Sequence, residues 1–203
     1  MRRGRASLDS RRQRIELLSI LLLKRSWFQS LSSSSWVTSI RSCDSKRPCT
    51  LMSKRVLLTG STGLIGRHVA RALHGKHQLI LASHAGHPIP EGRTLPFDLR
   101  EAGKITTWLD SLTPDVVVHT AAVTSADAAA QSPEEAELLN VTATRTIAEW
   151  CAMRGARMIH FSTDFVFDGT KSGWTEFEKP APLSWYGETK LKSEVMVREA
   201  LEN

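Results

Sequence analysis

An apolar run passes directly into a glycine-rich turn in the stretch Arg55-Val56-Leu57-Leu58-Thr59-Gly60-Ser61-Thr62-Gly63-Leu64-Ile65-Gly66. The run predicts a buried strand, and the pattern from Leu64 onward predicts a helix. A dinucleotide requires a tight strand-to-helix turn, a close backbone approach to its pyrophosphate, and close packing of helix on strand. Gly60, Gly63 and Gly66 occupy the positions in the turn that meet these three requirements. The N–H groups of residues 63–65 would point at the phosphates. The stretch predicts a dinucleotide site, with an ordinary glycine-rich turn as the alternative.

A second motif, Tyr186-Gly187-Glu188-Thr189-Lys190, opens a helical pattern near the end of the chain. Tyr186 and Lys190 are four residues apart, so a helix projects both from one face. A nearby ammonium would favour the phenolate and bring the pKa of the tyrosine toward neutrality, as an acid catalyst requires. The lysine could also hold the nicotinamide ribose. Without the glycine turn, an interfacial tyrosine and a surface lysine would be the better interpretation.

Short apolar runs alternate with helical patterns from residue 55 onward, which indicates parallel βαβ units. Strands are predicted over 55–59, 78–83, 94–97, 115–120 and 157–162, and helices over 64–74, 100–112, 133–154 and 186–201. The loop over 84–92 is too short for a full crossover helix, so the second helix should be vestigial or absent. The fold class is α/β, a Rossmann-type doubly wound parallel sheet of about five strands over residues 52–203. Thr163 follows the fifth strand at the edge where open α/β sheets bind ligands, and should bind the reacting carbonyl.

The cofactor predicted from these patterns is NADP, with NAD as the alternative. The second strand ends in Ala82-Ser83-His84 without the acid that binds the ribose 2′-hydroxyl of NAD. Arg67, just past the third glycine, could approach a 2′-phosphate. The alternative for Arg67 is a solvated helix residue.

The basic character of the chain belongs to its first 51 residues. The net charge is +6, but residues 1–51 hold 11 Lys and Arg against 3 Asp and Glu, which leaves 16 against 18 for residues 52–203. We expect this Ser-rich leader to be disordered or not native. Met52-Ser53-Lys54-Arg55 leads into the first strand as a natural amino terminus would, so an over-long start is favoured over a transit peptide or a disordered tail.

Composition also excludes several classes of function. The near-neutral charge of residues 52–203 argues against nucleic-acid binding, and no apolar run is long enough to span a membrane. Three scattered cysteines form no disulfide framework, which favours the cytoplasm. No metal-ligand cluster appears. His119 and His160 lie on predicted strands, where a satisfied core or edge histidine is the favoured interpretation over a ligand.

Two longer stretches carry a resemblance to a known family: Ser162-Thr163-Asp164-Phe165-Val166-Phe167-Asp168-Gly169, and Pro180-Ala181-Pro182-Leu183-Ser184-Trp185-Tyr186-Gly187-Glu188-Thr189-Lys190. With the glycine turn they resemble the extended short-chain dehydrogenase/reductases, and within these the dTDP-4-dehydrorhamnose reductase family. The branch also includes the regulatory beta subunit of methionine adenosyltransferase. The likeness covers about residues 54–200, and its most specific element is Asp164 to Gly169.

The resemblance implies hydride delivery to a nucleotide-linked 4-keto sugar. Tyr186 would donate the proton, and Lys190 would adjust the pKa of Tyr186. Thr163 would bind the carbonyl, and Asn140 would give water-mediated support. It also implies that Asp98 and Leu99 lie beside the adenine, and Ala121 and Ala122 beside the cofactor. The expected cofactor-binding set is Gly60, Thr62, Gly63, Leu64, Ile65, Gly66, Arg67, Asp98, Leu99, Ala121, Ala122, Tyr186 and Lys190.

The chain departs from the family in two ways. Phe165 stands where a tyrosine is usual, which removes a hydroxyl from the sugar side. The family also continues into further strands and a substrate lobe, so the sheet is expected to be incomplete, with exposed helices that offer a homodimer interface. The alternatives to a reductase are a non-catalytic NADP-binding regulatory subunit and an inactive truncated remnant.

Overall fold

The computed structural model describes residues 53–175 and 177–202. Of these, residues 53–168 and 180–202 belong to one compact unit, and Gly169–Lys179 are assigned to a second. In the second unit Lys171 pairs with Glu178 and lies over the Trp174 ring, with Nζ 4.4 Å from its centroid. The predictions made for the leader, residues 1–51, lie outside the described residues.

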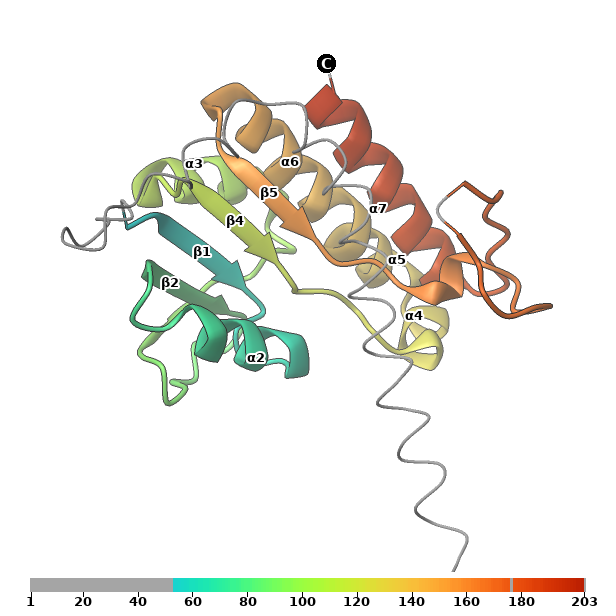
Figure 1. The fold of residues 1–203 in the computed structure, drawn as a ribbon, viewed down its shortest axis with the longest axis horizontal. Helices are drawn as coiled ribbons and strands as arrows, with labels where there is room; N and C mark the ends of the chain where they lie inside the picture. The colour runs from blue at the N-terminus through green and yellow to red at the C-terminus, as the bar shows by residue number, and fades with distance from the viewer. Residues whose placement is uncertain (1–52, 176, 203) are drawn as a thin grey trace, which may run out of the picture. The chain divides into compact units, whose positions relative to one another are not determined.

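The first unit contains a five-stranded parallel sheet in the order β3-β2-β1-β4-β5 (Figure 1). The register places Leu57 of β1 opposite Ile80 of β2 and Val117 of β4. The strands are β1 (Arg55–Thr59), β2 (Gln78–Ser83), β3 (Thr94–Pro96), β4 (Val116–His119) and β5 (Arg157–His160). The predicted fold class is therefore confirmed.

Helices pack on both faces of this sheet. Their bounds are α2 (Leu64–Leu73), α3 (Ala102–Leu112), α4 (Ala126–Gln131), α5 (Pro133–Ala136), α6 (Ala143–Arg154) and α7 (Trp185–Glu202). One core cluster joins α3 and α6 to one face, and another joins α2 to the opposite face (Figure 1). Leu57 points to the first and Leu58 to the second, both fully buried, which explains why the strand is apolar throughout. Burying one such side chain contributes about 1.5–3 kcal/mol.

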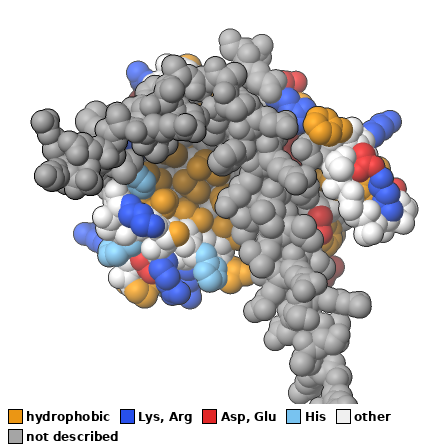
Figure 2. Space-filling model, viewed as in Figure 1, with side chains coloured by type: hydrophobic (Ala, Val, Ile, Leu, Met, Phe, Trp, Pro, Cys, Tyr) orange, Lys and Arg blue, Asp and Glu red, His pale blue; other side chains and the backbone are white. Residues whose placement is uncertain are grey.

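Apolar surface is exposed at the outer strand of the sheet. On the α2 face, Val56 and Leu58 of β1 and Val118 of β4 are buried. Figure 2 shows apolar side chains gathered where β1 and β4 lie in Figure 1, bordered by basic and histidine side chains. On the outer strand β5, Ile159 is 46% exposed.

Two features of the helical layer differ from the predicted pattern. The short helix α4 was not predicted; its first turn is capped by the Ser125 hydroxyl, which accepts from Ala128 N. The long helix predicted over 133–154 is present but contains the π-helical segment η2 (Glu137–Thr142) between α5 and α6. A π-helical segment inside an α-helix frequently marks a functional site.

The order of the strands reverses between β1 and β4, since β2 and β3 lie to one side and β5 to the other. Open α/β sheets bind ligands outside the carboxyl ends of their strands at such a point. No helix among residues 53–175 and 177–202 is long and apolar enough to cross a membrane.

Candidate active site

The turn after β1 is held against the neighbouring strands. Gly60 has a φ of +67°, a left-handed conformation that only glycine adopts without strain. A methyl group there would lie 2.7 Å from Ala121 N and 2.9 Å from Thr120 Oγ1. Ser61 N donates to Ala82 O at 3.0 Å, which ties the turn to β2. Ala121 and Ala122, both partly buried, follow β4 beside this turn.

The start of α2 meets the requirements of a phosphate site. Gly63 is its N-cap, with no side-chain cap, and the first turn carries no acid. Thr62 is partly buried, while Gly63, Leu64, Ile65 and Arg67 are exposed. At Gly66 a methyl group would collide with Gly60 O, so α2 can approach the turn only because glycine stands there. The N–H of Gly63 donates to Gly60 O at 2.9 Å, so the prediction that it points at the phosphates was wrong, because the turn itself uses it. The N–H groups of the first turn of α2 and the positive end of the helix dipole remain available to an anion.

Tyr186 and Thr163 come together beyond the carboxyl end of β5. Tyr186 is 9% exposed, and the Thr163 side chain lies close enough to its phenol to influence its pKa. Burial raises the pKa of Tyr186 above its ordinary value, the Thr163 hydroxyl lowers it, and the Asp164 carboxylate raises it further. The phenol therefore holds its proton at neutral pH.

Lys190 lies on the same helix but is directed toward β5. Its side chain is buried, and Nζ donates to Phe161 O at 2.6 Å and lies 3.3 Å from His160 Nε2. Burial lowers the pKa of Lys190 to about 8, opposed by the charge of Glu194. The expectation that this ammonium lowers the pKa of Tyr186 was wrong for this arrangement, because the lysine is engaged with β5 and burial dominates at the phenol.

Asn140 lies in the π-helical segment η2 and is 1% exposed. Its Oδ1 accepts from Val123 N at 2.8 Å, and Nδ2 donates to Val123 O at 3.1 Å and to Thr189 Oγ1 at 3.0 Å. The side chain thereby joins the segment after β4 to α7. These bonds engage both polar atoms of the amide, and none of the three is with Lys190.

Phe165 lies beside the tyrosine, with ring centroids 5.6 Å apart in an edge-on arrangement. It is 51% exposed. At Gly187 a methyl group would collide with Phe165 O, so glycine allows the segment after β5 to pack on α7. The fold thus places an apolar ring at the open side of Tyr186.

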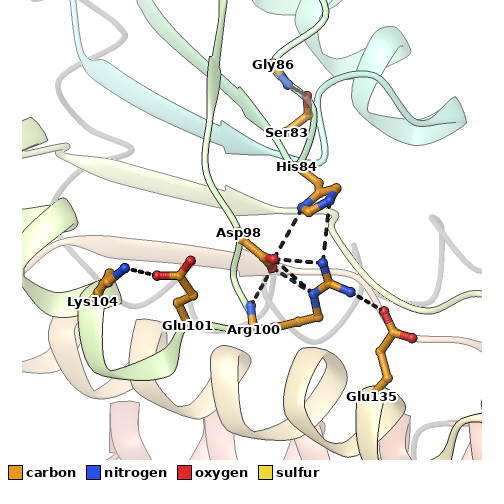
Figure 3. Close-up of polar contacts among 8 residues, drawn as sticks. All are labelled: Ser83, His84, Gly86, Asp98, Arg100, Glu101, Lys104 and Glu135. Atoms are coloured by element: carbon orange, nitrogen blue, oxygen red, sulfur yellow. Dashed lines mark hydrogen bonds and ion pairs between the residues drawn. The ribbon is translucent and has the colours of Figure 1, made fainter.

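At the ends of β2 and β3 a charged cluster surrounds Asp98 (Figure 3). Arg100 donates to both carboxylate oxygens of Asp98, through Nε at 2.9 and 3.1 Å and through Nη2 at 2.7 Å. Arg100 Nη1 also pairs with Glu135 of α5 at 2.7 Å, and His84 Nδ1 lies 3.5 Å from Asp98. The hydrogen bonds from Arg100 lower the pKa of Asp98 to about 2. Leu99, placed beside the adenine by the resemblance, is 6% exposed in the core.

Several residues at the site were missed at the sequence level. Asp98 is contacted by His84, which follows β2, and its partner Arg100 also pairs with Glu135 of α5. Apolar periodicity does not reveal such contacts. The two strand histidines, His119 and His160, differ in their contacts. Both ring nitrogens of His119 hydrogen-bond to threonines, to Thr59 at 2.7 Å and to Thr144 at 3.1 Å, as the prediction of a satisfied core histidine requires. His160 contacts Lys190, and its Nδ1 has no hydrogen-bond partner within the described part of the chain. No group of metal-binding side chains occurs among the described residues.

The sequence of the chain matches a known protein family. The model of the RmlD substrate binding domain matches residues 54–203. Among curated proteins, the methionine adenosyltransferase 2 subunit beta of Xenopus tropicalis is 36% identical over 71% of this chain and 43% of its own length. The dTDP-4-dehydrorhamnose reductase of Escherichia coli K12 is 34% identical over 71% of this chain and 46% of its own length.

The solved structures agree with the fold. A dTDP-4-dehydrorhamnose reductase from Bacillus anthracis, crystallised in complex with NADP, aligns with a TM-score of 0.63 and 26% identity over 73% of this chain and 50% of that one. The chain spans less than half the length of the two curated relatives named above.

Proposed function

The chain belongs to the RmlD substrate-binding-domain family, and from this premise we propose that it is an NAD(P)H-dependent reductase of a nucleotide-linked 4-keto sugar, of the dTDP-4-dehydrorhamnose type. One observation carries the proposal: Tyr186 and Thr163, whose side chains lie beside each other, are at the same edge of the sheet as the glycine turn. Parallel strands end at one edge, so the proposed proton donor and the proposed dinucleotide site lie at the same edge of the sheet.

The residues present fit a nicotinamide dinucleotide. Gly60 and Gly66 leave no room for a side chain, so the turn packs closely on β4 and on α2, and the start of α2 offers N–H groups to a pyrophosphate. When bound, the nicotinamide supplies the hydride. The residues proposed to hold the cofactor are Gly60, Thr62, Gly63, Leu64, Ile65, Gly66, Arg67, Asp98, Leu99, Ala121, Ala122, Tyr186 and Lys190. We favour NADP because β2 ends without an acid and Arg67 is exposed nearby.

Each catalytic side chain then has a defined role. Tyr186 holds its proton at neutral pH and donates it to the carbonyl oxygen of the sugar. Thr163 orients the phenol and shares the hydrogen bond to that oxygen. Lys190 would hold the nicotinamide ribose, and its pKa of about 8 leaves most of it charged at pH 7. Asn140 supports the site by fixing the segment after β4 against α7.

Two measurements on the purified full chain test this function. Binding should appear as a change in NADPH fluorescence, and a chain that changes the fluorescence of neither NADPH nor NADH would rule out the cofactor site. Oxidation of NADPH with dTDP-4-dehydrorhamnose should fall about 10²–10⁴-fold in Tyr186→Phe, the range for losing a general acid. Equal rates in variant and wild type would remove Tyr186 as the donor.

A second candidate is a cofactor-holding regulatory subunit. It is favoured by the 36% identity to a methionine adenosyltransferase beta subunit. A regulatory subunit would bind NADPH without turnover and would co-elute with a methionine adenosyltransferase catalytic subunit. Turnover that depends on Tyr186, without such co-elution, would favour the reductase.

A further inference from the structure

The ammonium of Lys190 is enclosed by groups from two strands and its own helix. On β5 it meets His160 Nε2 at 3.3 Å, and just beyond the strand Phe161 O at 2.6 Å. Glu194, four residues along α7, contributes a negative charge while its carboxylate accepts from the Ser162 hydroxyl. His119 of β4 interacts with the lysine electrostatically. With only 3% of the residue exposed, Lys190 depends on these neighbours rather than on bulk water.

His160 is fixed in place by contacts on its ring face and at one nitrogen. The ring stacks on that of His119, with centroids 5.7 Å apart and planes at 19°. Its Nε2 lies 3.0 Å from Ser193 Oγ as well as near the lysine. Nδ1 is buried and has no hydrogen-bond partner among the residues that the structure describes. Only Nε2 is therefore available to a neighbouring polar group.

The chemistry of the three groups decides which one donates. A lysine ammonium carries protons only, so an Nε2 that serves it must be the unprotonated nitrogen. The Ser193 hydroxyl donates its proton to Lys190 O at 2.7 Å, so Ser193 competes less well than the ammonium as a donor to the imidazole lone pair. Because the buried ammonium needs acceptors more than the hydroxyl does, the neutral ring is expected to place its proton on Nδ1.

We propose that His160 is a positioning residue for Lys190: its Nε2 accepts a hydrogen bond from the ammonium and, together with Phe161 O, fixes the direction of the lysine. That His160 supports a catalytic lysine rests on the proposed function. The contact between His160 and Lys190 does not depend on it, because both side chains belong to this chain and no ligand is involved. It also gives Lys190 a direct partner, while the Asn140 side chain is bonded to Val123 and Thr189.

The test measures the titration of Lys190 in the full chain labelled with [ε-¹³C]lysine. Comparison with Lys190→Met assigns the resonance. His160→Phe keeps a planar ring but removes the acceptor, so the charged lysine loses a hydrogen bond and its midpoint should fall by about one pH unit or more. His160→Gln keeps an acceptor and should return the midpoint toward that of the wild type. His119→Gln alters the same ring stack, and because burial lowers the pKa of His119 to about 3, no charge is lost where Lys190 titrates and the midpoint should stay in place.

Two outcomes would overturn the proposal: equal midpoints in wild type and His160→Phe, or an equal fall in the Phe and Gln variants. If the phenylalanine variant does not fold, the ¹⁵N shifts of the wild-type imidazole decide. Nε2 should be unprotonated at pH 7, and a proton found there would contradict the proposal. None of these measurements needs nicotinamide or sugar, so a failure to bind cofactor would count against the proposed function and leave this contact standing.

Discussion

Gly60 lies so close to Ala121 that a methyl group added to the glycine would come within 2.7 Å of the alanine amide nitrogen. Two separate features therefore require glycine at this position: its positive φ and the close approach of the neighbouring backbone. The contact fixes the turn after β1 against the end of β4, at the point where the strand order reverses. A site for a pyrophosphate depends on that fixed turn.

Gly60→Ala should destabilise the fold and abolish cofactor binding. The left-handed conformation costs a non-glycine residue roughly 1–3 kcal/mol, and the steric collision adds to it. Gly75→Ala is the matched control, since Gly75 has a φ of +72° but nothing within 4 Å of an added methyl group. Urea unfolding and NADPH fluorescence should show the control losing only the conformational part. Equal losses in both variants would mean that the Ala121 contact has no energetic weight.

The ion pair between Asp98 and Arg100 should make stability depend on acid. The folded pKa of Asp98 is depressed to about 2 from 3.8, so its stabilisation is complete above the unfolded value and is lost as pH falls from about 4 toward 2. Arg100→Gln should therefore cost about 1 kcal/mol at pH 7, given its partly exposed position, and much less near pH 2. Arg145→Gln, which breaks the exposed helix-surface pair with Glu149, should cost less. Urea unfolding at several pH values measures both, and a pH-independent difference would contradict the assignment.

Much of the fold could be predicted because local pattern and tertiary environment agree. The strands β1 and β2 have the bounds that the apolar runs predict, since both are buried in the middle of the sheet. The helix predicted from Arg100 begins instead at Ala102, because Arg100 N donates to the Asp98 side chain at 3.0 Å. The helix α4 is rich in alanine and has no apolar stripe, so periodicity does not reveal it.

The proposed catalytic residues could be found from the sequence for a different reason than their surroundings. Tyr186 and Lys190 share one helix face, and Thr163 follows a strand end, so local spacing indicates them. The direction of Lys190 toward His160, and the bond from Arg100 to Glu135, join positions about 30 or more residues apart. Such contacts depend on how strands and helices are placed in space, which no local pattern contains.

Replacing Asn140 should destabilise the protein more than its small volume suggests. In Asn140→Ala the Val123 N–H and C=O lose their side-chain partner, as does the buried Thr189 hydroxyl. Unsatisfied buried polar groups cost about 1–3 kcal/mol each, so a loss of roughly 2–4 kcal/mol is expected in urea unfolding. Gln131→Ala, at an exposed position on α4, should stay within about 0.5 kcal/mol of the wild type. A similarly small effect at Asn140 would show that this bridge does not hold the site together.

Tyr186 is the single tyrosine of the sequence, so the ultraviolet absorbance of the phenolate reports this side chain alone. Its pKa should lie above 10 in the folded chain, because burial disfavours the phenolate. Thr163→Val removes the hydroxyl that lowers this pKa and should raise it further, whereas Asp164→Asn removes a negative charge that raises it and should bring it down. Since the folded state holds this proton more tightly than the unfolded one, stability should fall as pH rises through the interval between the two pKa values. Shifts of the same sign in both variants would contradict the arrangement of Thr163 and Asp164 around the phenol, while opposite shifts would support a proton donor set by these two neighbours.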